Sequence, residues 1–233
     1  EAGAETAAES EGETAAEDAE EEKTAEGGTL IMGTNATFPP YEYYEGDEIV
    51  GIDVEIAQAI GEKLGMEVTV EDMEFDALIP ALKSGQIDLI ASGMDATPER
   101  AKQVSFTKPY FHDGYSVVVR KDNTTINGFQ DLSGKNVCTQ VGTKGVELGQ
   151  QAGAVIKQVD ANNQCWMELN SNNSDAVIIN TSVAMYYLSH GGENDLKLAG
   201  EPQMAPDGIA MAVSKDKPEM LEKVNKAIDE LKA

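Results

Sequence analysis

The sequence predicts an α/β fold that contains two successive α/β units. Short apolar runs typical of buried strands alternate with segments whose apolar residues recur every three or four positions, as in helices. From 30 to 91 the order is strand, helix, strand, helix, strand, and a second series begins at Val137. Such alternation is typical of parallel strands with helices packed against the sheet.

Residues that begin or end helices support this division. Gly65 and Gly85 follow two helical segments and suit helix C-termini, whereas Thr97 and Pro98 suit the first positions of another helix. We expect helices at 53–64, 75–83, 143–151, 163–169, 182–188 and 218–231, and one starting at Thr97–Pro98. We expect strands at 30–33, 68–70, 87–91, 115–120, 137–141, 155–159, 176–179, 196–198 and 209–213.

The charge of the chain is strongly negative and unevenly distributed. The formal net charge is −25, and residues 1–28 hold eleven acidic residues and one basic residue, Lys23. Because residues 1–28 also lack large apolar side chains, we expect a disordered acidic segment there. It would suit a tether between a surface anchor and a folded domain, or a passive solubilising tail. So acidic a chain is a poor partner for nucleic acid or an anionic membrane.

Other composition features narrow the protein class further. No apolar run reaches the length of a membrane-spanning helix. With two histidines and no zinc-ligand spacing, we expect neither a metal nor another cofactor. Cys138 lies in a strand-like run and Cys165 begins a helical segment. We expect two separate buried thiols, with a disulfide between them as the alternative.

Arg100 occupies an unusual position for a cation. The first turn of a helix already carries a partial positive charge, so a cation there is disfavoured. A bound anion would remove the conflict, because the guanidinium and the free N–H groups could hold a carboxylate together. The alternative is an ordinary surface arginine.

Several further segments follow expected strand ends, where ligands bind in parallel α/β sheets. Phe38 precedes two prolines that would present its ring rigidly to a ligand, or it belongs to the core. Phe75 would form another wall, or pack as a hydrophobic staple. The run Gly-Thr-Lys-Gly at 142–145 allows backbone N–H groups to approach an anion, or is an ordinary helix start.

Taken in order, these segments resemble the polar amino-acid family of solute-binding proteins of ABC importers. The resemblance covers about residues 29–231. Its matching stretches are 38–43 (Phe-Pro-Pro-Tyr-Glu-Tyr), 50–57, 78–82 and 85–89, then 97–104, 109–110, 142–143, 175–177 and 208–210, together with Phe75 and Phe106.

The resemblance implies a type II periplasmic-binding-protein-like fold of two lobes joined by two hinge strands, each lobe a mixed, mostly parallel sheet with flanking helices. Lobe 1 would comprise 29–111 and 209–233, and lobe 2 would comprise 112–208, with hinges near 112–116 and 203–208. In the family, aromatic side chains matching Phe38 and Phe75 contact the ligand and the arginine matching Arg100 grips its α-carboxylate. The remaining head-group contacts come from the positions matching Ser92, Gly93, Thr143 and Lys144.

Two departures from the family pattern concern the α-ammonium group of the ligand. The family usually places an aspartate where this chain has Asn180, and a threonine or serine where it has Asp95. Because an unpaired buried charge is very costly, we expect Asp95 to bind the ammonium and Asn180 to form a hydrogen bond only. Asn35 and Gln140 are neutral, so we expect a neutral polar amino acid, glutamine-like or cystine-like.

The expected function is capture of an amino acid by hinge closure and delivery to a membrane ABC permease. We expect a monomer outside the cytoplasm, in the periplasm or at the cell surface, with lipid anchoring through the N-terminal segment as one form of attachment. The alternatives are an enzyme similar to cyclohexadienyl dehydratases, and an extracellular sensor domain. No activated nucleophile is visible to favour the enzyme.

Overall fold

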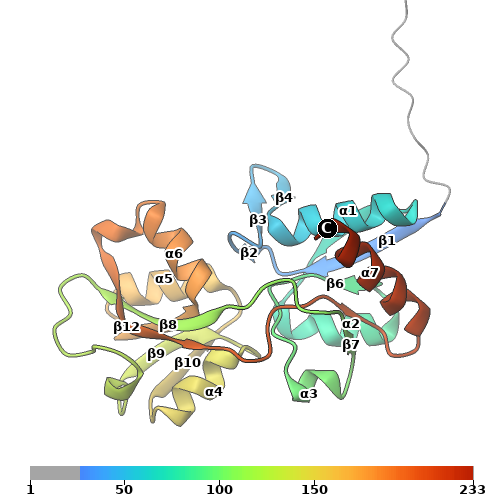
Figure 1. The fold of residues 1–233 in the computed structure, drawn as a ribbon. Coiled ribbons are helices and arrows are strands. Elements are labelled where there is room, and N and C mark those ends of the chain that lie inside the picture. Colours follow the sequence, from blue (N-terminus) through green and yellow to red (C-terminus); the bar gives the residue numbers. More distant parts are fainter. Residues whose placement is uncertain (1–26, 233) are drawn as a thin grey trace, which may run out of the picture.

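A computed structural model describes residues 27–232 as two α/β lobes lying side by side (Figure 1). A five-stranded sheet forms the centre of each lobe. The acidic segment predicted at 1–28 lies outside the described residues except for its last two. No helix within 27–232 is long and apolar enough to cross a membrane.

The first sheet has the strand order β5-β1-β6-β13-β7. Strand β1 runs parallel to β5 and β6, whereas β13 runs antiparallel to β6 and β7. The strands of this lobe are β1 (Thr29–Thr34), β5 (Glu67–Asp72), β6 (Leu89–Ile90), β7 (Ser105–Phe106) and β13 (Ala212–Val213), and its helices are α1 (Ile52–Leu64), α2 (Leu78–Ser84), α3 (Pro98–Ala101) and α7 (Pro218–Leu231), with a 3₁₀ turn, η1 (Phe75–Ala77), before α2.

The second sheet repeats this mixture of parallel and antiparallel pairs in the order β10-β9-β11-β8-β12. Strand β9 runs parallel to β10 and β11, and β8 runs antiparallel to β11 and β12. Its strands are β8 (Gly114–Arg120), β9 (Asn136–Gln140), β10 (Val155–Val159), β11 (Ala176–Asn180) and β12 (Leu196–Met204), and the helices are α4 (Lys144–Gln151), α5 (Asn162–Asn170) and α6 (Thr181–Ser189), with 3₁₀ turns η2 (Phe129–Asp131) and η3 (Gly192–Asn194).

The chain passes between the two sheets twice, through 107–113 and 205–211. The two crossings are joined by backbone hydrogen bonds, from Ala205 N to Asp113 O (3.0 Å) and from Ile209 N to Phe111 O (2.8 Å). They overlap the segments predicted as hinges. Bending of these segments, and the lobe boundaries predicted from the sequence, stay predictions.

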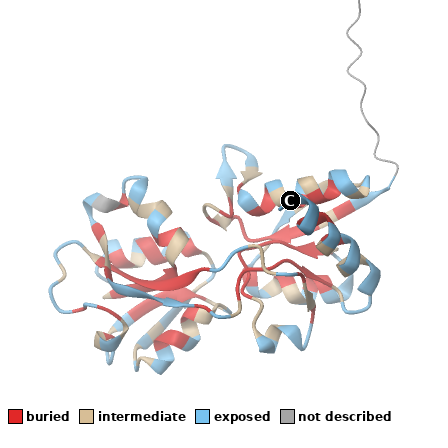
Figure 2. Cartoon of the chain, in the orientation of Figure 1, coloured by how far each residue is buried: buried red, intermediate tan, exposed pale blue. Residues whose placement is uncertain are grey.

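Helix α1 illustrates how the sequence forms these elements. Val54, Ala57 and Ile60 are buried on one face, as their three-residue spacing predicts. Gly65 ends the helix at a φ of 65°, where its N–H bonds the last carbonyls of the helix. Burial of Ile60 alone stabilises the fold by about 1.5–3 kcal/mol. In Figure 2 the buried residues concentrate in the two sheets and on the helix faces against them.

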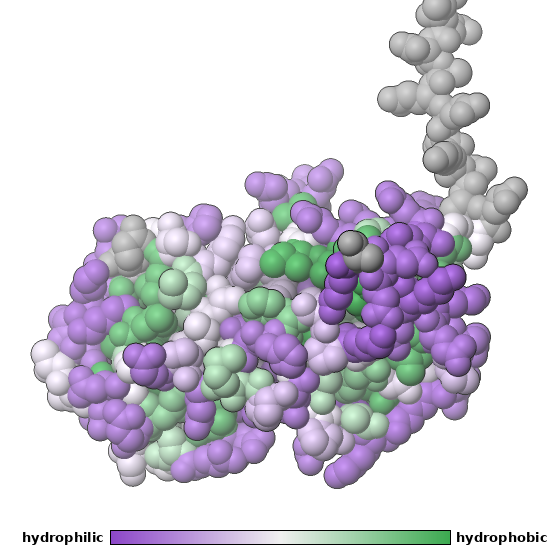
Figure 3. Space-filling view, viewed as in Figure 1, coloured by the Kyte–Doolittle hydropathy of each residue, from purple (hydrophilic) through white to green (hydrophobic). Residues whose placement is uncertain are grey.

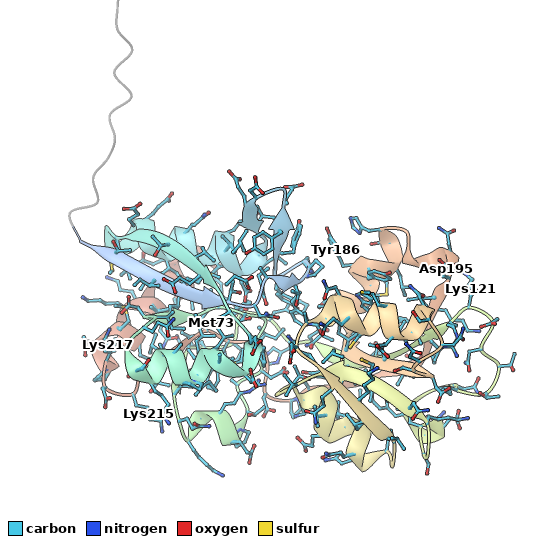
Figure 4. The ribbon with its side chains drawn as sticks, turned by 180° about the vertical axis from the view of Figure 1, so that it is seen from behind. Met73, Lys121, Tyr186, Asp195, Lys215 and Lys217 are labelled. Atoms are coloured by element: carbon cyan, nitrogen blue, oxygen red, sulfur yellow. The ribbon has the colours of Figure 1, made fainter. Side chains whose placement is uncertain are left out.

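A small third sheet was not predicted from the sequence. Its strands are β2 (Thr37–Phe38), β3 (Glu42–Glu45) and β4 (Glu48–Val50), in antiparallel order. It projects from the first lobe beside the second (Figure 1). Its Tyr43 ring lies 5.7 Å from the ring of Tyr186 on α6. Tyr186 sits at the junction of the lobes in Figure 4.

Some predicted elements are shorter in the structure. The strand expected at 209–213 covers only Ala212–Val213 in β13, because Ile209 instead pairs with Asp95 and Phe111 in the crossing. The helix at Thr97–Pro98 is the single turn α3, which packs no buried residue.

The expectation of two separate thiols needs correction. Cys138 and Cys165 are both free and buried, but their Sγ atoms lie only 3.0 Å apart. The sequence places them 27 positions apart, and the packing of α5 on the sheet brings them together.

Leu231, the last residue of α7, is 43% exposed. Together with Ile52 and Phe111 it lines an apolar hollow of about 400 Å³. Figure 3 shows an apolar area of surface beside the end of α7, among the polar side chains that cover most of this face.

Candidate functional site

A narrow pocket lies between the two lobes. About 290 Å³ of space lies between its walls. Side chains of Arg100 and Gln140 form hydrogen bonds from one lobe to the other across it, so the lobes are in contact over this pocket. The lining residues are Asn35, Phe38, Phe75, Ser92, Gly93, Asp95, Arg100, Tyr115, Gln140, Thr143 and Asn180.

These residues come from strand ends, as the topology requires. Asn35 follows β1 and Ser92 follows β6 in the first lobe, while Gln140 and Asn180 end β9 and β11 in the second. The carboxyl ends of parallel strands in both sheets therefore face one space, which is where α/β sheets bind ligands.

The guanidinium of Arg100 spans the gap between the lobes. Its Nη1 donates to the carbonyl of Asp95 (2.8 Å) and its Nη2 to the carbonyl of Gly142 in the other lobe (3.0 Å). Its Cζ lies 5.2 Å from the centre of the Phe75 ring, within cation–π range. Burial lowers the pKa of the guanidinium, which stays charged because an arginine pKa is so high. The side chain is fixed but keeps further N–H donors for an anion.

The predicted anion site at the start of α3 is only partly present. The N–H of Arg100 already bonds Oγ1 of Thr97 (3.3 Å), and α3 is a single turn. Anion binding here rests on the side chain of Arg100 rather than on free backbone N–H groups.

Asp95 is the acidic residue of the pocket and is only 2% exposed. Its Oδ2 accepts a hydrogen bond from the hydroxyl of Tyr115 (2.5 Å), whereas Oδ1 has no partner among the described residues. Burial raises the pKa of Asp95, while the Tyr115 hydrogen bond and the charges of Arg100 and Lys144 oppose that shift. An unpartnered, buried carboxylate oxygen of this kind attracts a cation.

Tyr115 is the site residue that the sequence analysis missed. It lies on β8, directly after the first crossing between the lobes, and is buried. Tyr115 belongs to an apolar run typical of a buried strand, so the sequence alone gave no reason to assign it to the pocket. Burial and the neighbouring Asp95 raise its pKa well above the usual value, which keeps the hydroxyl a donor.

Asn180 and Gln140 differ in how far their amides are engaged. Nδ2 of Asn180 has no partner among residues 27–232, although the side chain is buried. Nε2 of Gln140 donates to Oδ1 of Asn35 across the lobes (2.8 Å) and to the carbonyl of Asp160, while its Oε1 accepts from Asn162. Asn180 is thus free to donate to a ligand, whereas Gln140 holds the walls together.

Asn35 is fixed from both lobes. Besides Gln140, its side chain contacts Thr37 and the carbonyl of Met73, a residue of the first lobe labelled in Figure 4. Its Oδ1 thus accepts two hydrogen bonds and its Nδ2 donates one, which fixes the side chain in the pocket wall.

The aromatic walls pack closely on the backbone. The ring of Phe38 stacks on Tyr41 at 5.6 Å, and it covers Gly93. Gly93 has a φ of 50°, and an added Cβ would lie 2.6 Å from the Phe38 ring. Only glycine allows this ring to approach the loop after β6 so closely. Phe75 faces Arg100 as a wall of the pocket.

Two buried acids support the loop from behind. Oγ of Ser92 donates to Oε1 of Glu42 (3.1 Å), and the N–H of Gly93 bonds Oδ2 of Asp53 (2.7 Å). Both acids are fully buried. Burial and the nearby Asp53 raise the pKa of Glu42 well above its usual range, and burial raises that of Asp53 to about 6. The two acids therefore hold the loop after β6 through hydrogen bonds to Ser92 and Gly93.

Lys144 lies outside the pocket walls, unlike the other ten residues predicted for the site. Its Nζ pairs with Asp207 at 3.1 Å, and both side chains are largely buried. The acid in the second crossing, which the sequence analysis did not consider, directs the side chain away from the pocket. Thr143 does line the pocket, and it precedes the positive N-terminal end of α4.

Within 27–232, no group of three or more His, Cys, Asp or Glu side chains is placed to hold a metal ion. The site instead offers one cation, one acid, amides and aromatic walls.

Comparison with known proteins identifies the family. The model for bacterial extracellular solute-binding proteins, family 3, matches residues 30–233. The chain belongs to this family. It is therefore an extracellular solute-binding protein, and the prediction of a binding protein rather than an enzyme is confirmed.

Relatives of known ligand specificity cover most of the chain. An arginine-binding extracellular protein of Bacillus subtilis is 41% identical over 87% of this chain and 80% of its own length. An ABC transporter arginine-binding protein of Escherichia coli is 35% identical over 88% of this chain and 85% of its own.

Solved structures confirm the predicted two-lobed fold. An ancestral arginine-binding protein bound to arginine superposes with a TM-score of 0.83 at 39% identity, covering 89% of this chain and 93% of that one. An ancestral arginine-binding protein bound to glutamine superposes with a TM-score of 0.83 at 40% identity, covering 88% of this chain and 92% of that one.

Proposed function

We propose that this protein captures a free amino acid by closure of its two lobes and delivers it to a membrane ABC permease. The names of its relatives support both the ligand class and the transporter. The pocket between the lobes supports the mode of capture, because its walls come from both lobes.

The observation that carries the proposal is the pairing of opposite charges in one pocket. Arg100 supplies a planar donor for the α-carboxylate, and the unpartnered Oδ1 of Asp95 supplies an acceptor for the α-ammonium. Both belong to the first lobe, Asp95 in the loop after β6 and Arg100 in α3, which follows that loop. In this proposal the first lobe holds the head group, and Asn180 of the second lobe adds a hydrogen bond as the lobes close.

For the ligand side chain we propose a neutral polar group, such as that of glutamine. Arg100 and Asp95 balance each other, and both are used by the zwitterionic head group. Asn35, Gln140 and Thr143 add no charge, so a cationic side chain would lack an acidic partner on the walls. Arginine is the second candidate, because arginine-binding relatives share 35–41% identity and Phe38 offers an aromatic face to a guanidinium.

Release and uptake require the lobes to separate. Closure is held by contacts between lobes, including those from Arg100 to Gly142 and from Gln140 to Asn35. We propose that the crossings 107–113 and 205–211 bend, and that the permease recognises the closed form.

A panel of free amino acids in a thermal-shift assay tests the ligand. A ligand at 100 times its Kd stabilises by about 2.7 kcal/mol, which raises the Tm of a domain of this size by roughly 5–10 °C. Glutamine should give a larger shift than arginine, lysine or glutamate. A larger shift with arginine would overturn the neutral side chain but keep the amino-acid proposal, whereas no shift with any amino acid would overturn both.

We also propose attachment to the cell surface through the acidic N-terminal segment, and a monomeric state. Family membership supports a location outside the cytoplasm. Metabolic labelling of the full gene product with a fatty acid tests lipid anchoring, and light scattering of the purified protein tests the monomer.

A further inference from the structure

Two cysteines of the second lobe lie against each other behind the pocket wall. Cys138 is on β9 and Cys165 is in the first turns of α5, and their Sγ atoms are 3.0 Å apart. Each side chain is at most 1% exposed. A disulfide has an S–S bond of about 2.05 Å, so the two sulfurs need to approach by only about 1 Å.

The compartment of the protein makes this contact chemically relevant. Members of the family act outside the cytoplasm, where disulfides form and persist. The elements that carry the two sulfurs are already in contact: Cys138, Cys165, Trp166 and Leu169 share one buried cluster. The chain needs no rearrangement of its fold to join them.

We propose that Cys138 and Cys165 form a disulfide that fastens α5 to strand β9 of the second lobe. The bond closes a loop between residues 27 positions apart, which contains β10 and the whole of α4. The disulfide thereby constrains the segment that runs from β9 through α4 and β10 to α5.

The reaction is a thiol–disulfide exchange with a small-molecule or protein disulfide, R–S–S–R. The Cys138 thiolate attacks one sulfur of R–S–S–R and releases the first RS⁻. The Cys165 thiolate then attacks Sγ of Cys138 in the mixed disulfide and releases the second RS⁻. The two cysteines lose two electrons and two protons, and the oxidant leaves as two RSH. Because both sulfurs are buried, the oxidant reacts before the lobe completes its packing.

The bond supports the pocket from behind. Gln140 lies two residues after Cys138, and Asn162 lies three residues before Cys165. Nδ2 of Asn162 donates to Oε1 of Gln140 (2.9 Å), so the disulfide fixes the two elements whose amides form this wall. It acts on the stability of the lobe and leaves the groups that face the ligand unchanged.

Thiol counting on the full chain tests the proposal. The protein is refolded with oxidised glutathione, unfolded, and treated with iodoacetamide before or after reduction. We expect a monomer with no label before reduction and two labels after it. Reduction should lower the Tm by roughly 5–10 °C in the wild type. The double variant Cys138→Ala/Cys165→Ala should show no change in Tm with reductant.

Two labels without prior reduction, or cross-linked dimers on a non-reducing gel, would overturn the proposal. Each single variant, Cys138→Ala or Cys165→Ala, lacks the second thiol that displaces glutathione, so it should retain one glutathione by mass and take one label only after reduction, whereas the oxidised wild type should retain no glutathione. These measurements involve no ligand, so their outcome is independent of the proposed amino-acid specificity.

Discussion

Replacing Asp95 by asparagine removes the negative charge of the pocket with almost no change in shape. In the structure Oδ2 is held by Tyr115 and Oδ1 is unpartnered at 2% exposure of the residue. An asparagine oxygen still accepts the Tyr115 hydrogen bond, so the loop keeps its position. The ligand ammonium, however, becomes a buried charge without its partner.

The magnitude follows from the cost of stranding one member of a buried charge pair. Such truncations cost 2–5 kcal/mol, and a loss of about 3 kcal/mol corresponds to a Kd roughly 100-fold weaker. Isothermal titration calorimetry with the cognate amino acid measures this. Since the ligand-free wild type carries an unpaired buried carboxylate, Asp95→Asn should be at least as stable as the wild type in the absence of ligand.

Two controls isolate the effect of charge at the site. Glu99→Gln makes the same chemical change on an exposed residue of the same segment and should leave the Kd unchanged. An analogue with hydrogen in place of the α-amino group should bind Asp95→Asn at least as tightly as the wild type, because it offers no ammonium to pair with Asp95. A Kd of folded Asp95→Asn within threefold of the wild type would refute the reasoning.

Three further predictions follow from the same contacts. Arg100→Ala should weaken binding by at least about 100-fold, since a carboxylate is left unpaired in the pocket, and a Kd within tenfold of the wild type by calorimetry would contradict this. Tyr115→Phe should weaken binding by roughly tenfold through loss of the hydrogen bond that orients Asp95; an unchanged Kd argues against that role. The stability contributed by Asp53, whose pKa rises from 3.8 to about 6 on folding, is present below about pH 4 and lost as pH rises through 6. In urea unfolding the wild type should therefore lose up to about 3 kcal/mol more than Asp53→Asn as the pH rises; parallel pH profiles would contradict it.

Much of the fold could be predicted because local signals and tertiary packing agree. The helix expected at 218–231 matches α7 in full, and the helix ending at Gly65 stops at a left-handed glycine. The small sheet of β2, β3 and β4 was missed because strands of two to four residues have too few positions to show alternation. The predicted strand at 209–213 is longer than the observed one. Ile209 instead pairs with Asp95 and Phe111 in the crossing, and local sequence does not show such long-range pairing.

The site shows a similar division between local and long-range information. Ten predicted residues line one pocket because each follows a strand end or starts a helix, and sequence order marks such positions. Side-chain direction is not local. Lys144 turns to Asp207 in the second crossing, and Tyr115 reaches Asp95 from the other lobe's first strand. The 3.0 Å contact of the two thiols likewise depends on how α5 packs on β9.

The structure of the complex with the cognate amino acid tests the central claim most directly. The account predicts an α-carboxylate at about 2.7–3.0 Å from the guanidinium nitrogens of Arg100 and an α-ammonium nitrogen at a similar distance from Oδ1 of Asp95. It also predicts a hydrogen bond from Nδ2 of Asn180. A ligand bound outside this pocket, or an ammonium group that contacts the second lobe and not Asp95, would contradict it.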